Sequence, residues 1–429
     1  MLAMVHQDLL AALEEENGEA RRRGGFVYTT EMVLRLALCQ IMEGASLRGI
    51  VVRVDDSHIL RRFTRIHHGP MMGHTALCRL RNAITPQTWS AMNQLLAKTA
   101  VANDEISGER LRLDTTAVET NIHFPTDSSL LWDGYRTLAR VITEAREVCS
   151  SAVGTKRIHL KAAKRMATKI ARLGKARGKT KQKEQGVLYF TLIGQVEAIC
   201  TWAAEVSMGL ELEMDRTRNE TARSQSARVT DELHHYLPLV RRVVWQASER
   251  VLHNRPVANE DKLFSIFEEH TELLIRGKAG KPIEFGHMLQ IQQTGEKFIS
   301  DYTIFAKRPA EPALLAVAVE SHEKLFGEKP AVLTADKGYW SQDEFDELSK
   351  VVKVVSIPKK GRRTEAETER EHDSLFRLGQ AFRAGVEGSI SFLKRVLSLG
   401  RCMSKGWTHY AATVGATVFA HNLLVLARC

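Results

Sequence analysis

The stretch AVLTADKGYW, residues 331–340, combines a buried strand with a polar tip. Its first five residues are mostly apolar or β-branched, which is typical of a strand inside a sheet. Asp336, Lys337 and Gly338 follow at once. In open α/β sheets, ligand-binding and catalytic side chains gather beyond the carboxyl ends of strands. The stretch therefore predicts an α/β fold with a carboxylate at the tip of one strand.

A second aspartate occupies a similar place earlier in the chain. Leu111 and Leu113 alternate with Arg112, which is the period of a half-buried strand, and Asp114 comes next in RLDTTAVETN. We expect Asp114 within this strand or at its end. Either aspartate alone could be a turn residue, because Asp is common after strands. Two of them in equivalent places favour one shared polar site.

Further strands and helices complete the sheet pattern. Residues 281–305 predict two strands joined by a turn at 294–296, and 312–326 predict an amphipathic helix. A helix over 342–350 and a strand over 351–357 follow. Apart from a long helical stretch after the first strand, the order is β-β-β-α-β-α-β-α. The pattern predicts an α/β fold with a mixed five-stranded sheet and flanking helices.

The last helix of this pattern, over 373–399, supplies a third acid. Arg383, Glu387 and Lys394 share one face, because offsets of four and eleven residues return to nearly the same direction in an α-helix. Alone, Arg383 and Glu387 would be a surface ion pair of a few tenths of a kcal/mol. We expect the helix to bury a neighbouring apolar stripe, formed by Leu375, Leu378, Phe382, Val386, Leu393 and Leu397.

Three acids in this arrangement have a specific chemical use. Asp114, Asp336 and Glu387 could hold two hard divalent cations through oxygen ligands, the arrangement that activates oxygens in an in-line phosphoryl displacement. We therefore predict a Mg²⁺ (or Mn²⁺) site formed by these three side chains.

The charge of the chain indicates an anionic partner. Its 429 residues carry a formal net charge of +10, and the pI is about 9.3. Residues 156–183 contain twelve Lys or Arg and no acid. A one-signed run repels itself unless an anion neutralises it, so nucleic acid is the first candidate partner and a membrane surface the second. The expected contacts lie on one side of a helix: Lys161, Lys164, Arg165, Lys169 and Arg172.

The N-terminal 104 residues predict an all-α domain. Three short helices are expected, the second over 46–66 and the third in HTALCRLRNAI, which carries Arg79 and Arg81. Arginines on the last two helices favour a helix-turn-helix-like DNA reader over a bundle with a solvated basic face.

Other patterns exclude several classes of protein. The six cysteines are scattered without a CxxC pair, so neither a structural zinc site nor a disulfide framework is expected. No run of about 18 uninterrupted apolar residues appears, so no membrane span is expected. A reducing cytoplasm fits both observations. The predicted domain boundaries are an N-terminal helical DNA-binding domain, the first part of a catalytic domain, a helical basic insertion, and the remainder of the catalytic domain with C-terminal helices: 1–104, 105–150, 151–278 and 279–429.

The stretches that carry the three acids resemble a known family. LRLDTTAVETN, TADKGYW and RAGVEGSISFLKR look like the corresponding stretches of the DDE transposases of bacterial insertion sequences. The stretch NIHFPTDSSLL and the HNLL tail at 421–424 look like the ISNCY-type members of that family. Arg383, Glu387 and Lys394 match the R-x3-E-x6-K part of the signature Y-x2-R-x3-E-x6-K. Gln380 stands where the signature has tyrosine, so the role of that tyrosine is not carried over.

The resemblance implies a fold, an activity and partners. The fold would be RNase H-like, as in the integrase superfamily. The activity would be metal-dependent cleavage at the ends of an insertion sequence, followed by transfer of the 3′-hydroxyl into target DNA. Lys337, Tyr339, Arg383 and Lys394 would lie near the DNA backbone. The protein would act on double-stranded DNA, as a homodimer in the synaptic complex, in the bacterial cytoplasm at the nucleoid.

Three alternatives stay open at this stage. The chain could be a transposase-derived DNA-binding protein that no longer cuts. It could be another RNase H-like nuclease that cleaves branched DNA without joining strands. It could also be a basic RNA-binding or structural protein, in which replacing Asp114 would change nothing.

Overall fold

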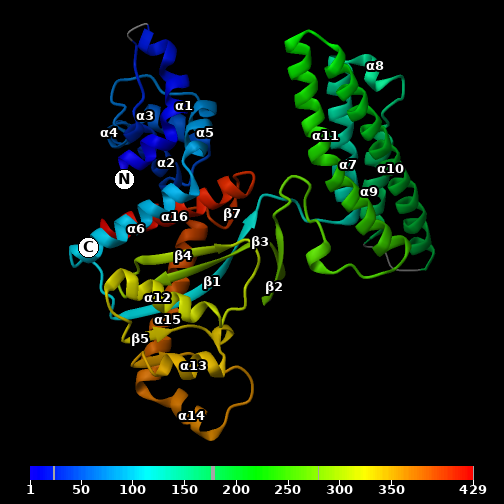
Figure 1. The fold of residues 1–429 in the computed structure, drawn as a ribbon. Coiled ribbons are helices and arrows are strands. Elements are labelled where there is room, and N and C mark those ends of the chain that lie inside the picture. The colour runs from blue at the N-terminus through cyan, green and yellow to red at the C-terminus, as the bar shows by residue number, and fades with distance from the viewer. Residues whose placement is uncertain (23–24, 175–178, 279, 429) are drawn as a thin grey trace. The chain divides into compact units, whose positions relative to one another are not determined.

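The computed structural model describes residues 1–22, 25–174, 179–278 and 280–428, and it divides into two compact units (Figure 1). Unit 1 comprises Met1–Asn121 and Leu274–Cys429, and unit 2 comprises Ile122–Leu273. The chain therefore leaves unit 1 after the first strand, forms unit 2, and returns to unit 1. The predicted long insertion after the first strand is present.

Unit 1 is built on a mixed seven-stranded sheet. The main path runs β2-β3-β1-β5-β6, while β4 pairs with β3 and β7 pairs with β1. β1 is antiparallel to β3 and parallel to β5, which is parallel to β6. The fold is thus α/β, as predicted, with two strands more than the five expected. The strands are β1 (Arg110–Thr120), β2 (Glu272–Lys278), β3 (Lys281–Gln293), β4 (Ile299–Phe305), β5 (Val332–Thr334), β6 (Val354–Ser356) and β7 (Arg401–Cys402).

The additional strand β2 corrects one part of the prediction. The sequence assigned residues 151–278 to a helical insertion, but residues 272–278 form a strand beside β3 in the sheet. β3 begins only three residues after β2 ends, so the two strands form a tight hairpin. The run ELLI is short and apolar, and such runs do not distinguish strand from helix by periodicity.

Alternation along β1 places its residues on two faces of the sheet. Leu111 and Leu113 are fully buried in a cluster with side chains of α12 (Leu314–Phe326). On the other face, Arg112 Nη1 donates a 2.8 Å hydrogen bond to the carbonyl of Phe382 in α15 (Ser374–Arg395). α12 and α15 therefore cover opposite faces (Figure 1). β1 continues to Thr120, so Asp114 lies inside the strand rather than at its end.

The buried face of α15 differs from the predicted stripe. Leu375 and Leu378 are 55% and 66% exposed, whereas the buried residues are Phe376, Gly379, Val386, Ser389 and Leu393. Gly379 explains the difference, because a Cβ there would lie only 2.5 Å from the Cβ of Ser356 on β6. The helix thus approaches the strand at a glycine, and a pattern of apolar residues does not predict such a contact.

Six helices precede β1 and pack in unit 1 with the last helix. The expected helix over 46–66 is in fact two, because Ser57 leaves the helical conformation and caps the next helix through Leu60 N–H. The ring of Trp89 lies 5.9 Å from that of Phe419, so the N-terminal helices share a core with α16. They are α1 (Leu2–Arg22), α2 (Thr30–Met42), α3 (Leu47–Asp56), α4 (His58–Thr64), α5 (His74–Ala83) and α6 (Pro86–Ala102), and α16 is Trp407–Leu426.

Unit 2 is a helical bundle with its own hydrophobic core. Thr126 caps α7 in a capping box with Ser129. The sequence grouped α7 with the sheet, but its apolar side packs on the other helices of unit 2. The boundary between sheet and insertion therefore falls before α7 rather than at residue 150. The α-helices are α7 (Asp127–Val148), α8 (Ser150–Val153), α9 (Leu160–Leu173), α10 (Lys179–Arg216) and α11 (Glu220–Ala247).

One helix of unit 2 has the length and apolar content of a membrane span. It is the segment Thr180–Arg216 of α10, and it is the only such helix in the part of the chain that the structure describes. Some of its apolar side chains, including Leu192, Val196 and Leu210, are buried in the core of unit 2, whereas others, including Phe190 and Met208, are exposed. A core helix of this kind meets the same criterion, so the helix is weak support for a membrane location.

Candidate functional site

Asp114 lies in β1, and Asp336 follows the end of the neighbouring parallel strand β5. In the β1–β5 ladder, Arg112 is the partner of Thr334. Asp114 and Asp336 lie two residues beyond these partners, and Asp336 keeps an extended backbone. Adjacent strands are about 4.8 Å apart. The sheet therefore brings together the two aspartates that the sequence singled out.

Tyr339 is buried beside these carboxylates. Its side chain is fully buried, and burial raises its pKa well above the ordinary value, with Asp114, Glu311 and Asp336 raising it further. Gln290 lies close enough to oppose that rise, but its amide nitrogen does not reach hydrogen-bond geometry. Among the described residues, neither the Tyr339 hydroxyl nor Gln290 Nε2 has a hydrogen-bond partner. Tyr339 is thus part of the interior of the site and not the DNA-facing residue that was predicted.

Glu311 is a third carboxylate of this region, and no sequence pattern predicted it. Its Oε1 accepts a 3.0 Å hydrogen bond from Thr115 Oγ1 and lies 3.5 Å from Arg308 Nη2. It stands in the turn before α12, where an acid is unremarkable as a helix-start residue. Only its hydrogen bond with Thr115, which is far away in the sequence, shows that Glu311 belongs to this region.

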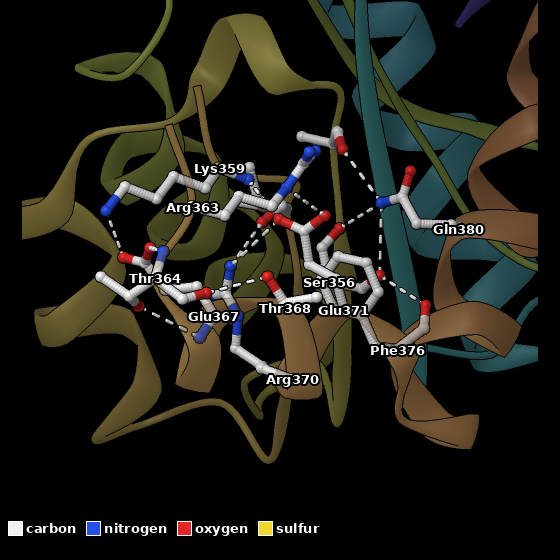
Figure 2. A network of polar contacts seen from close by, with 12 residues as sticks. Ser356, Lys359, Arg363, Thr364, Glu367, Thr368, Arg370, Glu371, Phe376 and Gln380 are labelled. Carbon is white, nitrogen blue, oxygen red and sulfur yellow. Dashed lines mark hydrogen bonds and ion pairs between the residues drawn. The ribbon is translucent and has the colours of Figure 1, made fainter. Parts of the chain in front are cut away.

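Gln380 connects α15 to the strand ends (Figure 2). Its side-chain amide donates to the carbonyl of Ser356 at 2.6 Å and to that of Ala335 at 3.3 Å. Ala335 directly precedes Asp336, so this contact holds the helix against the strand tip that carries the carboxylate. The residue that replaces the signature tyrosine therefore has a definite structural role here.

Glu387 lies on the same face of α15 as Gln380, because seven residues are almost two full turns. Its side chain is 65% exposed, and its carboxylate accepts a 3.2 Å hydrogen bond from Arg383 Nη2. Across the described ranges, no three His, Cys, Asp or Glu side chains are gathered closely enough to bind one metal ion together. The structure thus joins Asp114 and Asp336, but it does not add Glu387 to them as one ligand set.

Other residues predicted to contact DNA near the site have different surroundings. Lys337 is exposed directly beside Asp336, as a DNA contact requires. Lys394 is only partly buried and follows Glu387 by two turns on α15. Arg383 is mostly buried and engaged by Glu387.

The two N-terminal arginines make contacts within the protein. Arg79 forms ion pairs with Glu15 and Glu16 of α1. Arg81 is partly buried, and its guanidinium donates to Gln40 at 2.8 Å and to Ser404 at 2.6 Å. Burial also lowers the pKa of Arg81. These contacts stabilise the packing of α5 on α1, α2 and the segment before α16, which is not the arrangement expected of base-reading side chains.

The basic side of α9 is retained. Lys161, Lys164, Arg165, Lys169 and Arg172 are all exposed, while Ala163, Ala167 and Ile170 are buried on the opposite side. Lys169 pairs with Glu184 at 2.6 Å. Helical periodicity thus gathers the predicted cations on one solvent-facing surface. Residues 175–178 of the basic run lie outside the described residues.

A basic loop near the site is largely neutralised by an acidic helix. Figure 2 shows Lys359 and Arg363 directed toward Glu367 and Glu371 of α14 (Glu365–His372). The Lys359 ammonium, through its hydrogen bond, is the main cause that lowers the pKa of Glu367 to about 2. Ion pairs within the protein therefore neutralise half of the positive charge of the loop.

Comparison with known proteins adds no relative to this picture. No protein-family model, no curated protein and no solved structure matches the chain.

Proposed function

We propose that the protein is a DDE-type DNA transposase that cleaves at the ends of an insertion sequence and transfers the 3′-hydroxyl into target DNA. The observation that carries the proposal is the parallel register of β1 and β5, in which Arg112 is the partner of Thr334 and Asp114 and Asp336 each follow two residues later. A phosphoryl-transfer site needs carboxylates held in fixed mutual positions, and a sheet supplies that rigidity.

The order of elements supports an RNase H-like arrangement. Without unit 2 and the additional strand β2, the chain order from β1 to α15 is β1, β3, β4, α12, β5, α13 (Gln342–Ser349), β6, α14 and α15. Apart from the short helix α14, this is the β-β-β-α-β-α-β-α order expected from the sequence. β1 is central, with β3 antiparallel on one side and β5 parallel on the other.

Asp114, Asp336 and Glu387 remain the proposed ligands for Mg²⁺ (or Mn²⁺). When bound, the cation would activate water or the 3′-hydroxyl and stabilise charge on the transferred phosphoryl group. Strand alternation turns Asp114 toward the α15 side of the sheet, as it does Arg112 two residues earlier. Glu387 belongs to that helix, and its exposure leaves its carboxylate accessible.

The exposed cations of α9 are the proposed DNA-binding surface. Phosphate contacts by Lys and Arg release counterions and supply sequence-independent affinity. Binding of two transposon ends implies a homodimer on double-stranded DNA, at the nucleoid in the bacterial cytoplasm.

The test is cleavage of a labelled duplex that carries the inverted repeat flanking the gene, with Mg²⁺ or Mn²⁺ present. We expect wild type to cut and Asp114→Asn, Asp336→Asn and Glu387→Gln to bind the duplex without cutting. Glu320→Gln, an exposed acid on α12, is the matched control and should cut normally. Equal cutting by wild type and all three site variants would refute the assignment.

The second candidate is a transposase-derived DNA-binding protein without cleavage activity. The absence of a three-acid metal group among the described residues favours it. Wild type that binds the duplex but never cuts with either cation would support this candidate. Cutting of branched DNA without strand joining would instead indicate another RNase H-like nuclease.

A further inference from the structure

Glu311 and Asp336 approach each other across Gly338. A Cβ added at Gly338 would overlap Glu311 Oε2 and would lie 2.9 Å from Asp336 Oδ1. Both oxygens are near one point, so they are no more than about 5 Å apart. The Gly338 N–H donates to Asp336 Oδ1 at 2.8 Å, which fixes the orientation of that carboxylate. The space between the two acids exists because residue 338 has no side chain.

A buried tyrosine lies beside the same carboxylates. Tyr339 is fully buried, and its hydroxyl makes no hydrogen bond to any residue that the structure describes. A buried hydroxyl of this kind costs free energy unless a ligand or ion shell satisfies it. This observation is independent of the two carboxylates, and it indicates that the site accommodates a group besides the protein's own side chains.

The charge around the space favours a cation. Asp114, Glu311 and Asp336 contribute three carboxylates, and Arg308, 3.5 Å from Glu311, is the cation paired with that acid. Two carboxylates this close repel each other unless a proton or a cation lies between them. Oxygen ligands select hard divalent ions, and Mg–O distances of about 2.1 Å allow two ligand oxygens up to roughly 4 Å apart. The limit set by Gly338 is compatible with that separation.

We propose that Glu311 is a fourth carboxylate of the candidate catalytic site. Glu311 and Asp336 together bind a divalent cation in the space left open by Gly338. The catalytic use of this ion rests on the proposed function, whereas its binding does not. Glu311 enters from the α12 side of the sheet, opposite to the side of Glu387. Its role is therefore distinct from that of the signature glutamate.

The test measures binding of Mn²⁺ alone to the full chain, by the electron paramagnetic resonance signal of the free ion. We expect Glu311→Gln and Asp336→Asn each to weaken binding at least tenfold. Gly338→Ala should weaken binding comparably without removing a charge, because its methyl group displaces the Glu311 carboxylate. Glu320→Gln, which removes one exposed acid from the adjoining helix, should bind as wild type does.

The outcomes separate this proposal from the proposed function. If Glu311→Gln and Gly338→Ala bind Mn²⁺ as wild type while Asp336→Asn does not, Glu311 is not a ligand, and the transposase assignment stands. If wild type binds no Mn²⁺ at millimolar concentration, the cation site is refuted. Loss of duplex cleavage in Asp114→Asn and Glu387→Gln tests the function separately. Circular dichroism in EDTA verifies folding, and Glu311→Asp replaces Glu311→Gln if the latter is unfolded.

Discussion

Replacing Tyr339 with phenylalanine is expected to stabilise unit 1 when no divalent cation is present. The change removes only the hydroxyl, which is buried and has no hydrogen-bond partner among the described residues. A buried polar group without a partner costs about 1–3 kcal/mol, which is the free energy lost by removing it from water. We therefore expect the free energy of unfolding to rise by about 1–2 kcal/mol.

Tyr410 offers a control with the same chemical change and the opposite expected sign. It is also buried in unit 1, but its hydroxyl donates a 2.8 Å hydrogen bond to the carbonyl of Val118. Tyr410→Phe removes this bond and leaves a buried carbonyl with one partner fewer. A loss of about 1–2 kcal/mol is expected.

Urea unfolding in EDTA measures both variants in the same transition, since both tyrosines belong to unit 1. A change in midpoint at constant slope reports stability alone. The expected result is that the midpoint rises for Tyr339→Phe and falls for Tyr410→Phe. If Tyr339→Phe lowers the midpoint as Tyr410→Phe does, its hydroxyl has a partner, and the argument for a vacant polar space beside Glu311 and Asp336 loses its second support.

Three further predictions concern the stability of the two units. Asn422→Ala removes two buried 2.9 Å hydrogen bonds to the backbone of a single β4 residue, so urea unfolding should show a loss of about 2–4 kcal/mol; a loss below about 0.5 kcal/mol would contradict this. Gly134→Ala places a methyl group 2.7 Å from a valine methyl of α11, so it should lower the melting temperature of unit 2. Gly194→Ala, in open space on α10, should raise that temperature. Equal shifts of the two variants would refute the packing argument. The hydrogen bond that His123 Nε2 donates to the Asp133 carboxylate raises the pKa of His123 above its ordinary value. Because the pKa of His123 is higher in the folded than in the unfolded protein, this stabilisation is fully present below about pH 6.5 and is lost as pH rises through the raised pKa. The melting temperature of wild-type unit 2 should therefore fall between about pH 6 and pH 8, and it should fall less in His123→Gln.

Periodicity predicted the elements whose burial follows a single face. Leu111 and Leu113 alternate in the sequence because they pack on α12, and that packing is what makes β1 a strand. Between residues 46 and 66, local sequence signals indicated two different structures. Asp56 and Ser57 resemble a helix start, but the apolar residues on both sides suggested one continuous helix, and in the structure Ser57 caps a new one.

The candidate site was predictable only where it lies at strand ends. Asp114 and Asp336 carry that signal in the sequence, and in the parallel register of β1 and β5 both follow the last partner pair by two residues. Glu311 carries no such signal, since its contact with Thr115 spans the whole of unit 2 and depends on tertiary packing. The exposure of Leu375 likewise follows from the close approach of α15 to β6, a distance that no local pattern encodes.

Glu311 and Glu387 lie on opposite sides of the sheet, the first just before α12 and the second in α15. Glu311 lies at the start of α12, where Thr115 holds its carboxylate, and Glu387 lies on α15, where Arg383 holds the other. Asp114 and Asp336 stand between these layers at the carboxyl end of β5. A two-cation site needs ligands on both sides of a shared pair of acids, so that one ion can act on the attacking oxygen and the other on the leaving oxygen. The fold thus provides one partly buried glutamate that Thr115 holds and one exposed glutamate on a helix that Gln380 fastens to the strand tips. We infer that the Glu311 carboxylate is already in place in the free protein. The Glu387 carboxylate, in contrast, must leave Arg383 before it can bind the cation. A phosphate group that contacts Arg383 would favour this exchange.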